Sequence, residues 1–212
     1  MGRCMMLRKG ETHTTPRVGT PLSEIAVGSS IYLNENGSPA EYLVVHQGLP
    51  LSSYDASCDG TWLLRKDCYS YNRQWSTSEA YTKYEQSYIH KYLNSTCLEQ
   101  FDSDMQALIK TATVPSGADG ATAKLFLLNS GELARLSYFS GKDESSRIAY
   151  RNGTASFWWL RTHNSNYNYC ILSVQPDGAI AEMGTQTDSR GIRPALILPY
   201  NALLQDDGTI KI

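Results

Sequence analysis

Short apolar runs bounded by turn residues occupy both ends of this chain of 212 residues, and helical spacing is confined to its middle. Near the N-terminal end, residues 31–33 and 42–46 flank an Asn-Gly turn, which predicts a β-hairpin. Residues 62–64 predict a buried third strand. Four further strands are predicted near the C-terminal end, at residues 157–160, 169–174, 179–183 and 192–198. We therefore expect one α+β domain in which the hairpin and the last strand meet in a small antiparallel sheet, with helices packed on it.

The middle of the chain predicts two helices, a strand and a helical turn. Ser87 is expected to cap the first helix and Asp104 the second. Their apolar positions recur at intervals of three and four residues, namely Ile89, Tyr92 and Leu93, then Met105, Leu108 and Ile109. Residues 124–128 predict a short apolar strand. Ser130 is expected to cap the turn that follows, where Glu132 would interact favourably with the helix dipole.

Charge and cysteine content argue against several classes of function. The chain has 19 Lys and Arg against 21 Asp and Glu, and a net charge of −2 argues against a nucleic-acid-binding surface. No apolar run approaches the roughly 20 residues of a membrane span, so no membrane partner is expected. The five cysteines form no CxxC pair and show no zinc spacing, which indicates reduced thiols in a protein made in a cytosol.

Catalytic spacing is also missing from the sequence. The four histidines lie at positions 13, 46, 90 and 163, without the spacing of metal ligands. No serine nucleophile elbow and no phosphate-binding glycine loop occurs. We therefore expect no catalytic residue, no metal and no cofactor. A carboxylate pair, or a thiol site formed by Cys170 near His163, stays open as the alternative.

Residues 1–20 predict a flexible N-terminal arm, and residues 21–212 predict the folded domain. The apolar stretch of the arm, residues 4–7, is shorter than the hydrophobic region of a secretion signal. Glycine, threonine and proline follow it. The arm is therefore expected to be either a remnant of an upstream region or an attachment segment.

Two strings near the C-terminal end are the most distinctive in the sequence. One is Trp-Trp-Leu-Arg at residues 158–161, and the other is Gly-Ile-Arg-Pro-Ala-Leu at residues 191–196. They would form either an aromatic and cationic platform for a ligand or a core layer in which the arginines satisfy buried carbonyls or a carboxylate. The second interpretation is favoured, because tryptophan packing dominates cores. The expected scaffold residues are Trp158, Trp159, Arg161, Gly191, Arg193 and Pro194.

The segment between the two strings, residues 162–190, has the composition of a protein-binding loop. Its first eight residues contain no charged side chain and are rich in Tyr, Asn and Ser, as in antibody paratopes. A tolerant loop without a ligand is the alternative. The candidate ligand contacts are Thr162, His163, Asn164, Ser165, Asn166, Tyr167, Asn168, Tyr169, Gln175, Asp177, Glu182, Thr185, Thr187, Asp188 and Ser189. The Gln-Pro-Asp string at 175–177 is interpreted as a hairpin turn rather than a calcium site, because no acidic companion string follows.

The two strings with their polar connection resemble a domain of gut bacteria and their phages that carries W-W-L-R-S-P-like and G-V-R-P-A-L-like strands. Three upstream phrases fit the same family, at residues 44–48, 62–67 and 89–94. The resemblance covers residues 22–212. It implies a C-type-lectin fold of the formylglycine-generating-enzyme subtype, with small antiparallel sheets, packed helices and N and C termini close together.

That family includes proteins diversified by retroelements, in which a C-terminal variable region alters ligand binding on a fixed scaffold. The resemblance implies that residues 162–190 form the displayed surface. Enzyme relatives of the fold use two cysteines in the C-terminal half, and this chain offers only Cys170 there, so that activity is not carried over. Adenine-directed mutation of Asn codons fits residues 162–169 but cannot produce Gln175 or Glu182. Those positions would have to be fixed, or the segment would vary by ordinary drift.

We therefore expect a phage-encoded module that binds a ligand or receptor, with a bacterial surface protein or glycan as its partner. It would be displayed on a virion tail or capsid, or on the bacterial cell surface, after synthesis in the bacterial cytoplasm. An enzyme on the same fold and a structural virion protein without a specific ligand are the alternatives. The oligomeric state stays open, since no heptad stretch decides it.

Overall fold

An Asn36-Gly37 turn closes the N-terminal hairpin in the computed structural model, which describes residues 19–78, 80–115, 119–164, 166–167, 170–181 and 187–211. Asn36 and Gly37 take φ values of 50° and 80°, the positive values that a tight hairpin turn requires. The turn joins strand β2 (Ser30–Glu35) to strand β3 (Ser38–Gln47) in antiparallel pairing. The predicted hairpin is confirmed.

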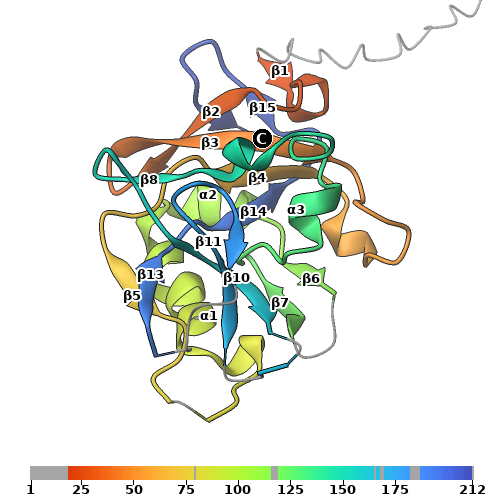
Figure 1. Cartoon of the computed structure of the whole chain (residues 1–212). Coiled ribbons are helices and arrows are strands. Elements are labelled where there is room, and N and C mark those ends of the chain that lie inside the picture. The colour runs from red at the N-terminus through yellow and green to blue at the C-terminus, as the bar shows by residue number, and fades with distance from the viewer. Residues whose placement is uncertain are drawn as a thin grey trace, which may run out of the picture.

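The hairpin belongs to a four-stranded antiparallel sheet with the order β14-β4-β3-β2 (Figure 1). Strand β4 (Thr61–Arg65) is the predicted third strand, and it pairs with β3 on one side and with β14 (Ala195–Leu198) on the other. The prediction that the hairpin and residues 192–198 share one sheet is confirmed, although the strand itself begins at Ala195. The α+β class follows from this sheet together with the helices packed near it.

A second sheet of five strands has the order β12-β11-β10-β13-β5 and carries the two distinctive strings. Its strands are β5 (Asn72–Gln74), β10 (Trp158–His163), β11 (Ile171–Val174), β12 (Ile180–Ala181) and β13 (Ser189–Gly191). Strands β10 and β13 run parallel, whereas the other neighbours are antiparallel. Short pieces complete the β structure, namely β1 (Thr20–Pro21), β6 (Ala112–Val114), β7 (Ala121–Ala123), β8 (Tyr150–Arg151), β9 (Thr154–Ala155), β15 (Leu203–Leu204) and β16 (Ile210–Lys211).

The predicted helices are present, but one cap differs. Helix α1 (Tyr88–Tyr92) begins after Ser87, whose Oγ accepts a hydrogen bond from the His90 N–H at 3.2 Å, as expected. A π-helical turn and a 3-10 turn extend α1 through residue 100. Helix α2 (Ser103–Leu108) is capped by Asp102, which accepts from the Met105 N–H at 2.8 Å. The expectation that Asp104 caps the helix was wrong, because the helix begins two residues earlier than that cap would place it.

Residues 124–128 are not the predicted strand. The N–H groups of Lys124 and Leu125 both donate to the side chain of Asn94, and the Leu127 N–H donates to the Tyr84 hydroxyl. Only Phe126 forms a β-bridge, with Ala195. Side chains from the helical region therefore take the donors that a strand partner would otherwise use.

Helix α3 (Glu132–Arg135) also differs from prediction at its start. Gly131 occupies the cap position without a side-chain bond, and Asn129 and Glu132 instead bond reciprocally to each other's backbone N–H. Ser130 is not the cap. Glu132 lies in the first turn of the helix, where its charge is favourable for the helix dipole as predicted, and at 1% exposure it is also a core residue.

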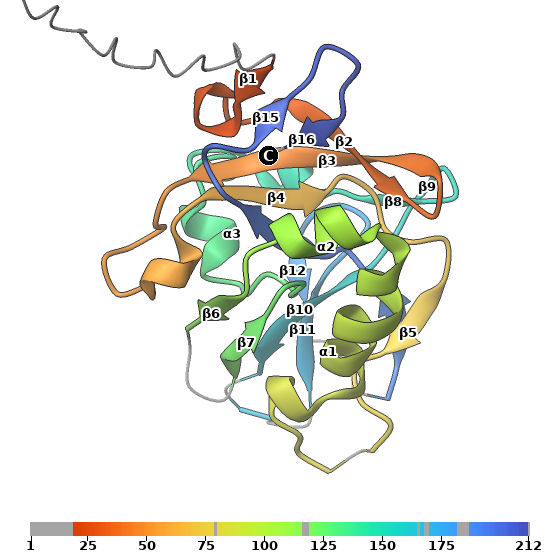
Figure 2. The same cartoon turned by 180° about the vertical axis from the view of Figure 1, so that it is seen from behind.

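The two ends of the described chain lie together at one end of the molecule. Strand β1 pairs with β15, which pairs with β16, and this small sheet is at the top of Figures 1 and 2. The ends of strands β10 and β11 that face away from it lie at the bottom of both views. No helix among the described residues is long and apolar enough to cross a membrane.

Candidate ligand-binding surface

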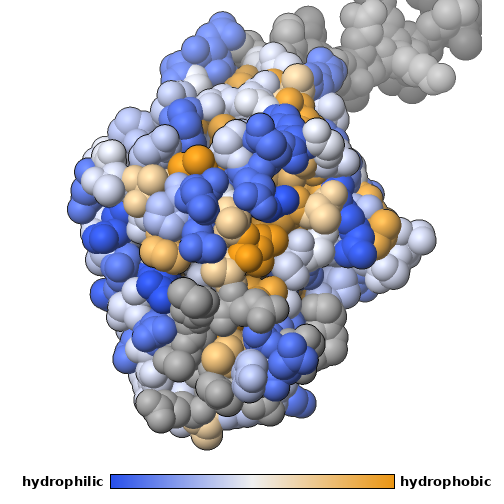
Figure 3. Space-filling view, in the orientation of Figure 1, coloured by the Kyte–Doolittle hydropathy of each residue, from blue (hydrophilic) through white to orange (hydrophobic). Residues whose placement is uncertain are grey.

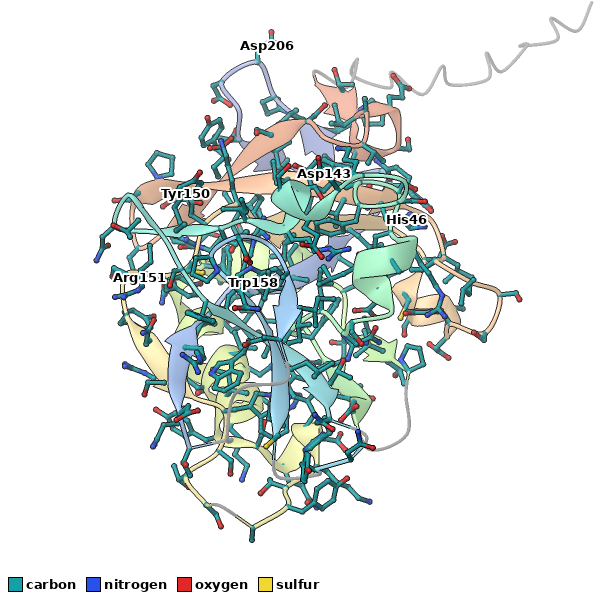
Figure 4. The ribbon with its side chains drawn as sticks, in the orientation of Figure 1. His46, Asp143, Tyr150, Arg151, Trp158 and Asp206 are labelled. Carbon is teal, nitrogen blue, oxygen red and sulfur yellow. The ribbon has the colours of Figure 1, made fainter. Side chains whose placement is uncertain are left out.

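The Trp158–Arg161 string is buried, and its tryptophans bond to the backbone of distant segments. Trp158 lies in the middle of the molecule (Figure 4), and its indole N–H donates to the Arg147 carbonyl at 3.1 Å. The Trp159 indole N–H donates to the Arg73 carbonyl on β5 at 2.8 Å. Both rings are fully buried. The interpretation of this string as a core layer is confirmed.

Arg161 is fully buried and pairs with the carboxylate of Glu132. Its Nη1 and Nη2 donate to the two carboxylate oxygens at 2.7 and 2.5 Å. Nη1 also donates to the Leu127 carbonyl at 2.5 Å, and Nε donates to the Asp119 carbonyl at 3.1 Å. The arginine therefore satisfies both a carboxylate and buried carbonyls, as the sequence predicted. It also fixes the backbone near Asp119, which faces the segment that follows β10.

The second string is equally internal. Arg193 donates to the Arg65 carbonyl at 2.8 Å and stacks on the Trp158 ring, and burial lowers the pKa of its guanidinium to about 10. Pro194 is buried, and its carbonyl accepts from the Arg65 N–H at 2.9 Å. A Cβ at Gly191 would lie 2.6 Å from the Phe157 carbonyl oxygen, so the parallel pairing of β13 with β10 requires glycine there.

The first residues of the segment 162–190 face inward, which differs from their expected display. Thr162 Oγ1 accepts from the Ser130 N–H at 2.9 Å. The His163 side chain is 8% exposed and lies between Trp75 and Tyr81. Asn164 is 4% exposed. Thr162 and His163 are the last residues of strand β10 and Asn164 follows it, and their side chains pack against neighbouring segments instead of pointing to solvent.

Both ring nitrogens of His163 face acceptors. Nδ1 bonds to the Asp119 carboxylate, and Nε2 lies 3.0 Å from the Thr82 carbonyl oxygen. A general base keeps one ring nitrogen available for a substrate proton, whereas His163 uses both to connect three segments of the chain. We therefore interpret the His163–Asp119 pair as a structural contact that holds together the loops at this end of the sheet.

The exposed part of the segment begins after Asn164. The Asn164 Oδ1 accepts from the N–H groups of Asn166 at 2.7 Å and Tyr167 at 3.2 Å, which forms a tight turn. Tyr167 is 56% exposed and Asn166 is exposed. Tyr81, which sequence analysis did not select, is 42% exposed and contacts the His163 ring from the opposite loop. Ser165, Asn168 and Tyr169 lie outside the described residues.

The Gln175–Gly178 stretch is the predicted hairpin turn between β11 and β12. The Gly178 N–H donates to the Gln175 carbonyl at 2.9 Å, and Asp177 accepts from the Ala179 N–H at 3.0 Å. Gln175 is half-buried and Asp177 is exposed. The described residues contain no cluster of three His, Cys, Asp or Glu side chains that could hold a metal ion. Glu182 and Thr185 lie outside the described residues.

The end of the segment joins the edge of the five-stranded sheet. The Thr187 carbonyl accepts from the Gln74 side chain at 2.7 Å, and Ser189 lies opposite Gln74 in the β13–β5 ladder. Thr187 is half-buried, while Asp188 and Ser189 are exposed. An open cleft of about 360 Å³ lies beside Ser189, and its other lining residues are Asn72, Arg73, Gln74, Thr77 and Tyr88.

Sequence analysis missed the cleft residues, although a signal was present. Residues 71–75 read Tyr-Asn-Arg-Gln-Trp, which repeats the aromatic and amide mixture of the segment 162–169. We define the sheet-end surface as the exposed residues Tyr81, Asn166, Tyr167, Asp188 and Ser189. Over the face shown in Figure 3, hydrophilic residues predominate, and the most conspicuous of several hydrophobic patches lies near the middle of the view.

A family model described as a domain of unknown function, DUF6273, matches residues 59–200, which is more than half of the chain. The chain belongs to this family. The DUF6273 match begins before β4 and ends after β14, so it includes both strings, the segment between them and the β5 cleft. The β2–β3 hairpin lies outside it. Comparisons with curated proteins and with solved structures found no significant match.

Proposed function

We propose that this DUF6273 protein is a ligand-binding module that presents the sheet-end surface on a rigid scaffold. The observation that carries the proposal is the contrast along one strand: Trp158 to Asn164 are held by internal hydrogen bonds, and Asn166 and Tyr167 emerge directly after them. Side chains placed by a rigid element lose little conformational freedom on binding.

The residue types support binding rather than turnover. Tyrosine supplies a large contact area for little rotamer entropy, and asparagine offers both a donor and an acceptor. Tyr81 and Tyr167 are both largely exposed at this end of the molecule. The candidate base, His163, has both ring nitrogens engaged with acceptors.

The finer parts of the proposal rest on the resemblance stated above. We propose a C-type-lectin-like arrangement, a variable segment at 162–190 and a phage or bacterial-surface location, with a bacterial surface protein or glycan as the partner. The α+β architecture and the adjoining ends of the chain are compatible with that arrangement.

A binding experiment tests the module directly. The labelled full chain is applied to an array of bacterial polysaccharides and to intact bacterial cells. Tyr167→Ala and Tyr81→Ala are expected to weaken binding at least tenfold without changing the melting temperature. Tyr150→Ala is the matched control, because Tyr150 is 46% exposed but lies on β8, away from the sheet-end surface (Figure 4). Equal losses in all three variants, or no binding to any probe, would overturn the proposal.

The variable character of the segment has a separate test. Deep sequencing of the locus in its source community should show substitutions concentrated between Thr162 and Arg190, at exposed positions such as Asn166 and Tyr167. Positions held inward, such as His163 and Asn164, should vary less. Substitutions scattered evenly over the chain would refute the proposal of a variable segment. The proposal of a binding module would then depend on the binding experiment with polysaccharides and cells.

A further inference from the structure

The β5 cleft is built by an edge strand and the start of a helix. Strand β5 is the last strand of its sheet, and α1 packs beside it (Figure 2). Trp159 holds the strand from inside through the Arg73 carbonyl, and Gln74 holds the Thr187 carbonyl. The walls of the cleft are therefore fixed by the core and not by flexible loops alone.

The lining of the cleft is suited to a sugar. Tyr88 is 36% exposed and offers an aromatic surface against which the C–H face of a pyranose can pack. Asn72, Gln74, Thr77 and Ser189 supply hydrogen-bonding groups around it. A cleft of about 360 Å³ falls within the range of small-ligand sites.

Two residues that line the cleft each have a polar atom without a partner. Within the part of the chain that the structure describes, Asn72 Oδ1 and Arg73 Nε are buried and have no hydrogen-bond partner. One is an acceptor and the other is a donor. A buried polar atom without a partner destabilises the fold, and ligand hydroxyls can both donate and accept.

The charge of the cleft favours an anionic ligand. Arg73 lies directly opposite Arg190 in the β13–β5 ladder, an arrangement of like charges that destabilises a strand pair. Arg190 has Asp188 at 3.7 Å, whereas no carboxylate among the described residues lies within ion-pairing distance of Arg73. The Arg73 guanidinium is instead held over the rings of Tyr71 and Tyr92, at 4.5 and 4.9 Å. A held cation without a counter-charge is suited to a ligand carboxylate.

We propose that the β5 cleft binds a carboxylate-bearing sugar, such as a uronic acid unit of a bacterial polysaccharide. Arg73 binds the carboxylate, Tyr88 packs on the ring, and Asn72 and Gln74 bind hydroxyls. The inference rests on the proposed function, because it names the ligand class for one edge of the same binding surface.

The test compares one sugar in two charge states. Calorimetry is performed on the full chain with a galacturonic acid hexamer and with the same hexamer after its carboxyl groups are reduced to alcohols. The acidic form should bind at least tenfold more tightly. Arg73→Gln should remove that difference, and Tyr88→Ala should weaken both forms. Arg135→Gln and Tyr150→Ala, which change an exposed arginine and an exposed tyrosine elsewhere, should bind like the wild type.

Arg73→Lys separates charge from folding, because it keeps the cation and should retain a preference for the acidic form. Equal affinity for the two hexamers, or no binding of either, overturns the inference. Tighter binding of a poly-glutamate peptide at the same cleft overturns the sugar class. If Arg73→Gln loses the acidic sugar while Tyr81 and Tyr167 variants bind every probe normally, the inference holds and the proposed sheet-end function fails. The converse result rejects only the inference.

Discussion

Replacing Glu132 with glutamine should be among the most damaging single-atom changes available to this fold. The carboxylate accepts four hydrogen bonds, from the Tyr54 hydroxyl, the Asn129 N–H and the two terminal nitrogens of Arg161. Each carboxylate oxygen faces two of these donors. In Glu132→Gln the amide NH₂ therefore faces an Arg161 donor in either orientation, and the buried Arg161 loses its counter-charge.

The expected cost follows from the burial of the pair. Both side chains are 0% exposed, and breaking such a pair by removing one partner costs about 3–5 kcal/mol of unfolding free energy. For a domain of this size that corresponds to a fall in melting temperature of roughly 6–20 °C. The four buried tryptophans report unfolding in guanidinium by their fluorescence.

The control uses an exposed ion pair in the same protein. Glu41→Gln removes the partner of Lys66, whose side chain is 47% exposed, and should cost no more than about 1 kcal/mol. A double variant, Glu132→Leu with Arg161→Met, should lower the free energy of unfolding by less than the two single variants lower it together. If Glu132→Gln costs no more than Glu41→Gln, the buried pair is not the anchor that the geometry indicates.

Three further predictions concern other buried groups. Burial lowers the pKa of His46 and His90 below the ordinary 6.5, so the unfolded chain binds protons that the folded chain does not. The free energy of unfolding should therefore fall as pH decreases from about 7 to about 5. In the double variant His46→Gln/His90→Gln the guanidinium midpoint should depend less steeply on pH than in the wild type, and an equal dependence would contradict this. Burial raises the pKa of the Cys58 and Cys68 thiols to about 11, so few of these thiols are ionised at about pH 8. In a Cys4→Ser variant, iodoacetamide should therefore modify the half-buried Cys170 before Cys58 or Cys68, and mass spectrometry measures the order of modification. Gly178→Ala should lower the free energy of unfolding, measured by thermal unfolding, by at least about 1 kcal/mol more than Gly153→Ala. Both glycines have positive φ, but only a Cβ at Gly178 would meet backbone, 1.9 Å from the Glu144 carbonyl oxygen. Equal losses in the two variants would refute the clash.

Local patterns predicted the elements whose structure depends on nearby residues. Asn36-Gly37 closes a hairpin with its own backbone conformation, and Ser87 caps the helix that follows it by accepting from the His90 N–H, three residues on. The Trp158–Arg161 string was assigned to the core on residue type alone. The prediction of Asp104 as a cap failed, because Asp102 and Asp104 lie only two positions apart and both satisfy the same local rule.

Contacts between distant residues could not be predicted in the same way. His163 faces inward because Asp119 and Thr82 supply acceptors for its two nitrogens, and these residues lie 44 and 81 positions away. Residues 124–128 have strand-like composition, yet Asn94 and Tyr84 take their backbone donors. The β5 cleft likewise exists only because Gln74 and Ser189 meet across a ladder.

The small sheet of β1, β15 and β16 holds both ends of the described chain at one end of the molecule. In this sheet β15 lies between the two chain ends, and the loops after β10 lie at the other end of the molecule. A carrier protein, bead or surface joined at either end would therefore leave the opposite pole unobstructed. The same geometry favours immobilisation through a terminal tag, since coupling through random surface lysines would present the molecule in mixed orientations.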